Sequence, residues 1–209
     1  KVILPCKPSK IICAADNYYS KYSKNKKYKE PYLFLKSPNA LSLDKDKIRI
    51  PDKKWHVWGE PELGIVIKKK ITFKTKIKSL DEFILGYLVC NDVTSKNIIG
   101  RDHHLVRSKS ADGFCPVSKY IYSKETFKKN DVIIGYVNDK PIRSGKLSDR
   151  IFSDKEIIKF LSKWFELLPG DIVLTGAPVF KRKDIYLKNK DVYRCKIGNT
   201  VEIINSFHT

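Results

Sequence analysis

The sequence contains no methionine, and its five cysteines are too scattered to form a disulfide framework or a zinc site. Cys6, Cys13, Cys90, Cys115 and Cys195 are odd in number and are never spaced as C-x-x-C, the spacing of many zinc and redox motifs. Reduced, scattered cysteines are typical of cytosolic proteins. We therefore expect a cytoplasmic protein with free thiols and without zinc.

Long apolar runs are also missing. No stretch reaches the roughly 20 apolar residues that a membrane-spanning helix needs, and the N-terminus lacks the basic and then apolar pattern of a signal peptide. Hydrophobic residues still make up 42% of the chain, which argues against a disordered basic tail. We expect one domain over residues 1–209, with no membrane partner.

Acidic residues are scarce, since 23 aspartates and glutamates stand against 42 lysines and arginines, for a net charge of +19. A dense basic face attracts phosphate, so nucleic-acid binding is one alternative. However, the lysines are spread over every loop, with local runs only at residues 24–27 and 68–70, and no recognisable nucleic-acid module accompanies them. A basic field also steers small anionic substrates, so we regard nucleic acid as the less favoured partner.

Three carboxylates flank two apolar stretches in the first half of the chain. Glu60 and Glu62 precede the apolar residues 63–67, and on an extended strand both side chains point to the same face. A second apolar run ends at Asp92. Close like charges need a cation between them, or one must stay protonated. Three oxygen ligands are a usual way to hold Mg²⁺ or Mn²⁺; the alternative is a pair of solvated glutamates at the mouth of a strand.

The remaining patterns indicate many short strands and two helices. We expect strands at 10–15, 32–36, 131–137, 171–174 and within 191–207, with a hairpin turn at Asn138-Asp139. Capping boxes predict one helix that begins at Ser79 and another over 153–168. Residues 94–110 are polar and are predicted to be loop, including the adjacent His103 and His104. The pattern indicates an α+β, mostly β domain.

Short motifs follow one another along nearly the whole chain: Asn17-Tyr18, residues 33–38, 60–63, 91–94, Lys109-Ser110, residues 115–118, 148–153 and 168–176. Their order resembles that of the fumarylacetoacetate hydrolase family, in particular its small single-domain members such as the acylpyruvases and the 2-hydroxyhepta-2,4-diene-1,7-dioate isomerases. The resemblance implies a mixed β-roll of the fumarylacetoacetase C-terminal-domain type, usually a homodimer.

The resemblance also implies the chemistry. A divalent ion, normally Mg²⁺ with Mn²⁺ or Ca²⁺ as substitutes, would be bound by Glu60, Glu62 and Asp92. Lys109 matches a catalytic lysine that lies against the substrate, and Lys36 and Thr175 match substrate-binding positions. Family substrates are small anionic 2-oxo or 2,4-dioxo acids, which undergo carbon–carbon hydrolysis, decarboxylation, dehydration or keto–enol isomerisation through an enolate.

The chain departs from the family where hydrolytic members activate water. A histidine and a glutamate follow their Asn-Tyr motif, but Lys21 and Lys24 stand at these positions here. The turn after Leu174 carries Ala177 in place of a substrate-contacting threonine, and Lys96-Asn97 replaces an Arg-Asp pair. We therefore expect a Mg²⁺-dependent enzyme in which proton transfer is more credible than hydrolysis, with Lys21 as a candidate proton carrier. The alternative is a catalytically impaired member that binds the metal and the oxo acid.

Overall fold

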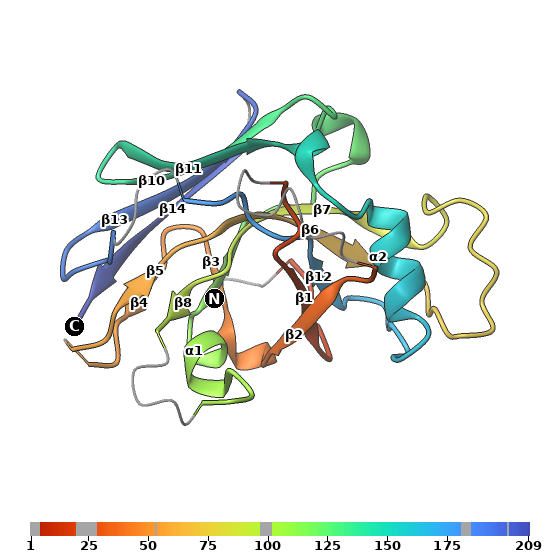
Figure 1. Ribbon diagram of the computed structural model, residues 1–209, viewed down its shortest axis with the longest axis horizontal. Coiled ribbons are helices and arrows are strands. Elements are labelled where there is room, and N and C mark those ends of the chain that lie inside the picture. The colour runs from red at the N-terminus through yellow and green to blue at the C-terminus, as the bar shows by residue number, and fades with distance from the viewer. Residues whose placement is uncertain (1–4, 20–28, 53, 97–101, 181–184, 200) are drawn as a thin grey trace.

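The computed structural model describes residues 5–19, 29–52, 54–96, 102–180, 185–199 and 201–209. Within these ranges the chain is mostly β, with two main sheets, one short two-stranded sheet and two α-helices (Figure 1). The expected α+β, mostly β class is confirmed. No helix in the described part of the chain is long and apolar enough to cross a bilayer.

The larger sheet has seven strands in the order β2-β1-β12-β6-β7-β9-β3. Their bounds are β1 (Ile11–Ala15), β2 (Tyr32–Lys36), β3 (Leu41–Leu43), β6 (Pro61–Ile67), β7 (Ile84–Asn91), β9 (Cys115–Val117) and β12 (Ile172–Leu174). The sheet is mixed, because β1 with β12 and β3 with β9 run parallel while the other neighbours run antiparallel. Every residue of β6 is buried, so this strand lies at the centre of the fold.

The second sheet has five strands in the order β11-β10-β13-β14-β4. Their bounds are β4 (Lys47–Arg49), β10 (Val132–Val137), β11 (Lys140–Lys146), β13 (Val192–Ile197) and β14 (Val201–His208), while β5 (Val57–Trp58) and β8 (Thr94–Ser95) form the two-stranded sheet. The predicted hairpin turn is confirmed, since Asn138 (φ 46°) and Asp139 (φ 63°) both take the left-handed conformation that a tight two-residue turn requires.

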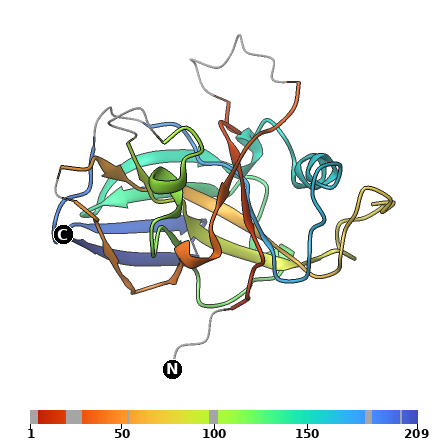
Figure 2. The same ribbon diagram turned by 90° about the horizontal axis from the view of Figure 1, so that it is seen from below.

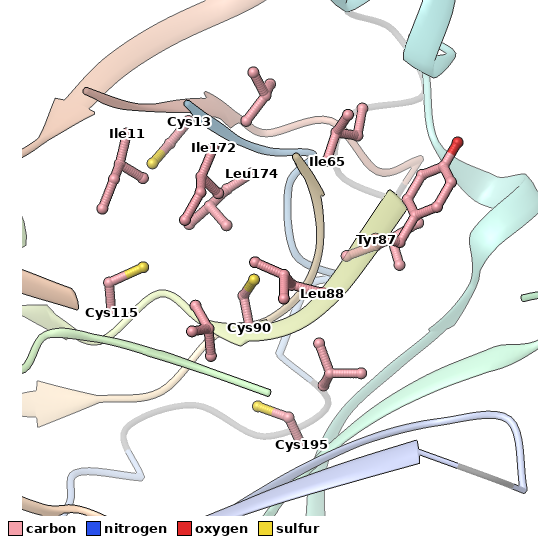
Figure 3. Packing of buried hydrophobic residues seen from close by; sticks show 14 of the residues in the cluster. Ile11, Cys13, Ile65, Tyr87, Leu88, Cys90, Cys115, Ile172, Leu174 and Cys195 are labelled. Carbon is pink, nitrogen blue, oxygen red and sulfur yellow. The ribbon is translucent and has the colours of Figure 1, made fainter. Parts of the chain in front are cut away.

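The two main sheets pack face to face around one hydrophobic core. Figure 3 shows Cys195 of β13 directed toward β7, which carries Leu88 and Cys90. The Tyr193 side chain packs directly against two glycines at the contact between the sheets. A Cβ at Gly59 would lie 2.5 Å from its ring, and a Cβ at Gly135 would lie 2.3 Å from its hydroxyl. These glycines set the spacing of the sheets beside Glu60. All five cysteines are free thiols.

The helix α2 (Asp154–Leu161) lies on the opposite side of the molecule from the C-terminus (Figure 2). Its predicted start is confirmed: the Ser153 backbone N–H donates to Glu156 Oε2 (2.8 Å), and the Glu156 N–H donates to Ser153 Oγ (3.4 Å). The predicted end at 168 is wrong. The Leu167 N–H donates instead to the carbonyl of Ile71 (2.9 Å), and Trp164 is 70% exposed.

Two further predictions from local patterns are wrong. No helix begins at Ser79, because the Ser79 hydroxyl accepts from Asp81 N–H (3.2 Å), the chain makes a single turn and β7 begins at Ile84. The polar segment also contains a short helix, α1 (Val106–Ser110). Asp102 caps it from a distance, since its carboxylate accepts from the backbone N–H groups of Arg107 (3.1 Å) and Ser108 (2.7 Å). His103 and His104 lie in the turn before α1, as expected.

Candidate active site

The strand register brings the three predicted carboxylates together. β6 and β7 pair antiparallel with Pro61 opposite Asn91, so the start of β6 lies beside the end of β7. The Asp92 N–H donates to the Glu60 carbonyl (2.8 Å), and the Asn91 side chain accepts from the Glu60 N–H (2.9 Å). As a result, Glu60, Glu62 and Asp92 each place a carboxylate oxygen within 4.8 Å of the others.

Two lysines contact this cluster. Lys109, on α1, donates to Glu60 Oε2 (3.0 Å), Asp92 Oδ2 (2.5 Å) and Thr94 Oγ1 (2.6 Å). Lys36, at the end of β2, donates to the other oxygen of Asp92 (2.5 Å) and to a backbone carbonyl, and its side chain is fully buried. Asp92 is therefore held between two ammonium groups.

A third cation, Arg143, reaches the cluster from the five-stranded sheet. Its Nη2 donates to Glu60 Oε1 (2.8 Å) and its Nη1 to the carbonyl of Pro178 (3.0 Å). The guanidinium carbon lies 3.4 Å from the centroid of the Phe180 ring. Trp58 also donates to Glu60, from its indole N–H to Oε1 (3.1 Å).

The sequence analysis missed Arg143 because the usual alternation of a strand fails there. Gly135 pairs with Arg143 but the next residue, Tyr136, pairs with Pro141, so Ile142 is an extra residue in β11. Both Ile142 and Arg143 are then buried, against the alternation expected of a hairpin strand. Without knowing that Gly135 pairs with Arg143, one cannot infer this arrangement from the sequence.

Glu62 is held from the opposite side by the turn that follows β12. The Gly176 N–H donates to Glu62 Oε2 (2.6 Å). Gly176 has φ 96°, and a Cβ there would lie 2.7 Å from the Cβ of Asn17. Only glycine lets the backbone approach the carboxylate so closely. Asn17 in turn donates to the Thr175 carbonyl (2.8 Å), which ties the end of β1 to this turn.

The charges around the two glutamates shift their pKa values in opposite directions. Burial alone would raise the pKa of Glu60, but the positive charges of Lys109 and Arg143 outweigh it and hold the pKa below its usual range. For Glu62, burial and the negative charges of Asp92 and Glu60 raise the pKa well above its usual range. The surroundings therefore favour the charged form of Glu60 and disfavour the charged form of Glu62.

A cavity of about 470 Å³ opens above these groups. It is lined by Ala14, Ala15, Asp16, Tyr18, Tyr32, Phe34, Trp58, Glu60, Glu62, Asp92, Thr94, Leu105, Lys109, Arg143, Ala177 and Val179. Aromatic and aliphatic side chains form much of its wall, and the three carboxylates lie together with Lys109 and Arg143. This combination suits a small anionic ligand with an apolar skeleton.

The structure does not place every predicted site residue in this cavity. Within the described part of the chain, Lys36 and Thr175 are absent from its lining. The Thr175 hydroxyl is fully buried and donates to the carbonyl of Leu63 (2.8 Å), so it joins β12 to β6. The Lys36 ammonium group donates to Asp92. The predicted substrate-binding roles of Lys36 and Thr175 stay predictions, and Lys21 lies outside the described residues.

The donor set fits a divalent cation. Carboxylate oxygens are the ligands that Mg²⁺, Mn²⁺ and Ca²⁺ prefer, and three of them leave coordination positions for water or substrate. The position of the Lys109 ammonium group between Glu60 and Asp92 shows that this point attracts positive charge. Glu60, Glu62 and Asp92 are thus the residues that would hold such an ion.

Two relatives align with most of this chain. The chain is 34% identical over 193 residues to an uncharacterised protein of Methanocaldococcus jannaschii, an alignment that covers 91% of this chain and 79% of the relative. It is 30% identical over 211 residues to the mitochondrial oxaloacetate tautomerase FAHD2A of Bos taurus, which covers 95% of this chain but only 66% of that relative.

Solved structures give the same grouping. The 5-carboxymethyl-2-hydroxymuconate delta-isomerase of Mycobacterium smegmatis matches 100% of this chain and 82% of its own, with a TM-score of 0.85 and 25% identity. The 2-hydroxyhepta-2,4-diene-1,7-dioate isomerase of Mycobacterium marinum matches 98% of this chain and 76% of its own, with a TM-score of 0.83 and 27% identity. The family model for the C-terminal domain of fumarylacetoacetate hydrolase matches residues 10–208, and the chain therefore belongs to the fumarylacetoacetate hydrolase family.

Proposed function

We propose that the chain is a divalent-cation-dependent tautomerase of a small 2-oxo acid. The reaction moves a proton between the carbon beside the 2-oxo group and the 2-oxo oxygen, and consumes no water. The observation that carries the proposal is the cluster of Glu60, Glu62 and Asp92 with Lys109, set in a cavity of about 470 Å³. The likeness to an oxaloacetate tautomerase and to two isomerases supports it.

The site residues have separable tasks in this proposal. A divalent cation held by the three carboxylates would supply positive charge beside the 2-oxo group, which favours the enolate over the ketone. Lys109 is a cationic donor that lines the same cavity, so its ammonium group adds to the stabilisation of developing negative charge. The aromatic walls, which include Phe34 and Trp58, keep bulk water away and strengthen these electrostatic interactions.

Proton transfer is favoured over hydrolysis because the histidine that usually activates water is missing from the described cavity lining and from the segment 20–28. The described residues that line the cavity include no histidine. The segment 20–28, where hydrolytic relatives carry their water-activating pair, contains neither histidine nor glutamate. A tautomerase needs only a carrier for one proton, and lysine serves when its pKa is lowered. Lys21 stays our candidate for this carrier.

The test is the rate at which the enol and keto forms of oxaloacetate equilibrate, followed by ultraviolet absorbance with and without Mg²⁺. We expect catalysis that needs Mg²⁺ and that falls at least about 100-fold in Glu62→Gln, because the variant loses a charged ligand. Glu166→Gln is the matched control, since Glu166 is paired with Lys70 on the exposed surface. It should behave as wild type.

Calorimetric titration of oxalate, a mimic of the enolate, distinguishes the remaining alternatives. Mg²⁺-dependent oxalate binding that needs Glu62, together with measurable tautomerisation, supports the proposal. Such binding without turnover of any oxo acid would instead indicate the catalytically impaired, ligand-binding alternative. Absence of binding in both wild type and Glu62→Gln would mean that the carboxylate cluster is structural.

A further inference from the structure

Arg143 is a cation of this site that has no task in the proposed proton transfer. Glu60 already receives hydrogen bonds from Lys109 and Trp58. Arg143 is nevertheless 95% buried and lines the cavity, at a cost in desolvation that a structural role toward Glu60 does not by itself explain. An arginine buried beside a ligand cavity is a common means of binding a carboxylate.

The Arg143 guanidinium has donors to spare. It carries five N–H groups, and its recorded acceptors are one carboxylate oxygen of Glu60 and the carbonyl of Pro178. Its Nε has no hydrogen-bond partner in the described part of the chain. The ring of Phe180 lies flat against the group at 3.4 Å, which holds the plane of the fork. The side chain is therefore oriented before any ligand arrives.

The arrangement of charge gives the cavity two separate cationic positions. Lys109 approaches Glu60 at Oε2, and Arg143 approaches the same carboxylate at Oε1, next to the turn that carries Ala177 and Val179. Ala177 and Val179 offer no side-chain donor to a ligand. On that side of the cavity, Arg143 is the described side chain able to pair with an anionic group.

The balance of charge points to a ligand with two negative groups. When all three carboxylates are ionised to hold a cation, the charges of Lys36, Lys109 and Arg143 balance those of Glu60, Glu62 and Asp92, and a divalent cation would add two positive charges. Asp16 also lines the cavity, but it is exposed to solvent and so is screened. A monocarboxylate leaves one positive charge unbalanced, whereas a dicarboxylate leaves none.

We propose that Arg143 binds the second carboxylate of a dicarboxylic 2-oxo acid, the carboxylate remote from the 2-oxo group, and thereby selects dicarboxylic over monocarboxylic substrates. The inference rests on the proposed function, because it assumes that the 2-oxo acid end of the ligand lies at the three carboxylates. It assigns to Arg143 a contact with substrate and not only the support of Glu60.

Two stable ligands test this assignment without turnover. Oxamate and N-oxalylglycine share the same 2-oxo carboxylate head, and N-oxalylglycine adds one further carboxylate. We would measure both affinities by calorimetry in the presence of Mg²⁺, in wild type, Arg143→Gln and Arg143→Lys. We expect wild type to prefer N-oxalylglycine and Arg143→Gln to bind it about 10- to 100-fold more weakly, while the loss of oxamate affinity at saturating Mg²⁺ is smaller.

Arg143→Lys guards against a folding defect in the glutamine variant, because it keeps the charge but loses the planar fork. It should retain more affinity for N-oxalylglycine than Arg143→Gln does. Equal losses for both ligands would overturn the inference and show that Arg143 acts only through Glu60, and unchanged affinity for N-oxalylglycine would overturn it as well. If wild type binds neither ligand with Mg²⁺, the proposed function itself fails, and this inference fails with it.

Discussion

At the scale of single residues, Lys109 pairs with two of the candidate metal ligands in the metal-free protein. Its ammonium group lies within hydrogen-bonding distance of two of the three candidate metal ligands, Glu60 (3.0 Å) and Asp92 (2.5 Å). Burial alone would lower the pKa of Lys109, but the charges of Asp92 and Glu60 outweigh it and raise the pKa above its usual range. A charged lysine therefore occupies the point at which a divalent cation would be attracted.

This position predicts opposite effects of Lys109→Met with and without metal. Without divalent cations we expect the variant to be less stable by about 3 kcal/mol, because buried carboxylates lose a partner. With Mg²⁺ we expect a larger rise in melting temperature than in wild type, because no ammonium group competes for Glu60 and Asp92. Thermal unfolding with and without Mg²⁺ measures both effects.

Lys124→Met is the control for this experiment, since the Lys124–Asp81 pair is more than half exposed on both sides. It should change neither the stability nor the response to Mg²⁺. A response to Mg²⁺ in Lys109→Met equal to that of wild type would contradict competition between the lysine and the cation.

At the scale of elements, Asp171 fastens β1 to the turn before β12. Its Oδ1 accepts from the Ser9 N–H (2.9 Å), the Ser9 hydroxyl (2.7 Å) and the Lys10 N–H (3.2 Å). Its Oδ2 accepts from Lys10 Nζ (2.6 Å) and from the Leu168 N–H (2.8 Å). Burial alone would raise the pKa of Asp171, but the hydrogen bonds from Lys10, Leu168 and Ser9 outweigh it and lower the pKa.

Because the pKa of Asp171 is lowered in the folded state, its contribution to the stability of the fold decreases as the pH falls. The contribution of Asp171 is present above the ordinary aspartate pKa of about 3.9 and is lost as the pH falls through the lower value in the folded protein. We expect Asp171→Asn to cost about 2 kcal/mol at neutral pH, and to lose less stability than wild type on acidification. Urea unfolding at pH 7 and pH 3 measures this; parallel losses in both proteins would refute the assignment.

The contact between the two sheets yields a second prediction at this scale. The Tyr193 hydroxyl is buried and has no hydrogen-bond partner among the described residues, so Tyr193→Phe should be at least as stable as wild type. Gly135→Ala should lose at least about 2 kcal/mol, because its Cβ would lie 2.3 Å from that hydroxyl. Chemical denaturation compares them, and a marked loss in Tyr193→Phe would reveal a partner for the hydroxyl.

At the scale of the whole molecule, the sequence predicts the fold better than it predicts the detail of the site. The apolar runs around Glu62 and Asp92 are buried strands, and antiparallel pairing of those strands is enough to bring the carboxylates together. Local signals failed where a longer-range contact competed. Leu167 pairs with Ile71 instead of extending α2, and Asp102 caps α1 from outside the usual N-cap position.

The sequence did not indicate Arg143 as a site residue, for a similar reason. Whether Arg143 faces the cavity depends on one extra residue in β11, and the position of that residue depends on pairing with β10. A pattern of alternating side chains cannot register such a shift. The same limit applies to Thr175, whose motif was recognised although its hydroxyl is used within the sheet.

Association of two chains is a further expectation at this scale, implied by the family resemblance. β2 lies at one end of the seven-stranded sheet and carries the exposed side chains of Tyr32 (62%) and Leu35 (50%). Exposed apolar groups on such an edge favour pairing with another chain. We expect a homodimer in sedimentation velocity and weaker association in Leu35→Lys. Leu85→Lys, at a similarly exposed leucine of β7 (52%), is the control; equal behaviour of both variants would place the interface elsewhere.

The net charge of +19 acts on the molecule as a whole. A field of this sign attracts a small dianion from beyond contact distance and so raises the rate of encounter, while the chemistry inside a buried site is little affected. Because salt screens exposed charges over about 8 to 10 Å at physiological ionic strength, only the encounter should depend on salt. The two kinetic constants should therefore respond differently.

We expect kcat/KM for an oxo dianion to fall as the ionic strength rises from 0.02 to 0.5 M, by about tenfold, while kcat stays constant. Steady-state kinetics over a potassium chloride series measures this, and a neutral ester of the substrate controls for effects of salt on the protein. If the basic surface instead serves nucleic acid, single-stranded DNA should bind tightly with a steep dependence on salt, and binding should survive Glu62→Gln. A kcat/KM independent of salt would show that the charge has no part in substrate capture.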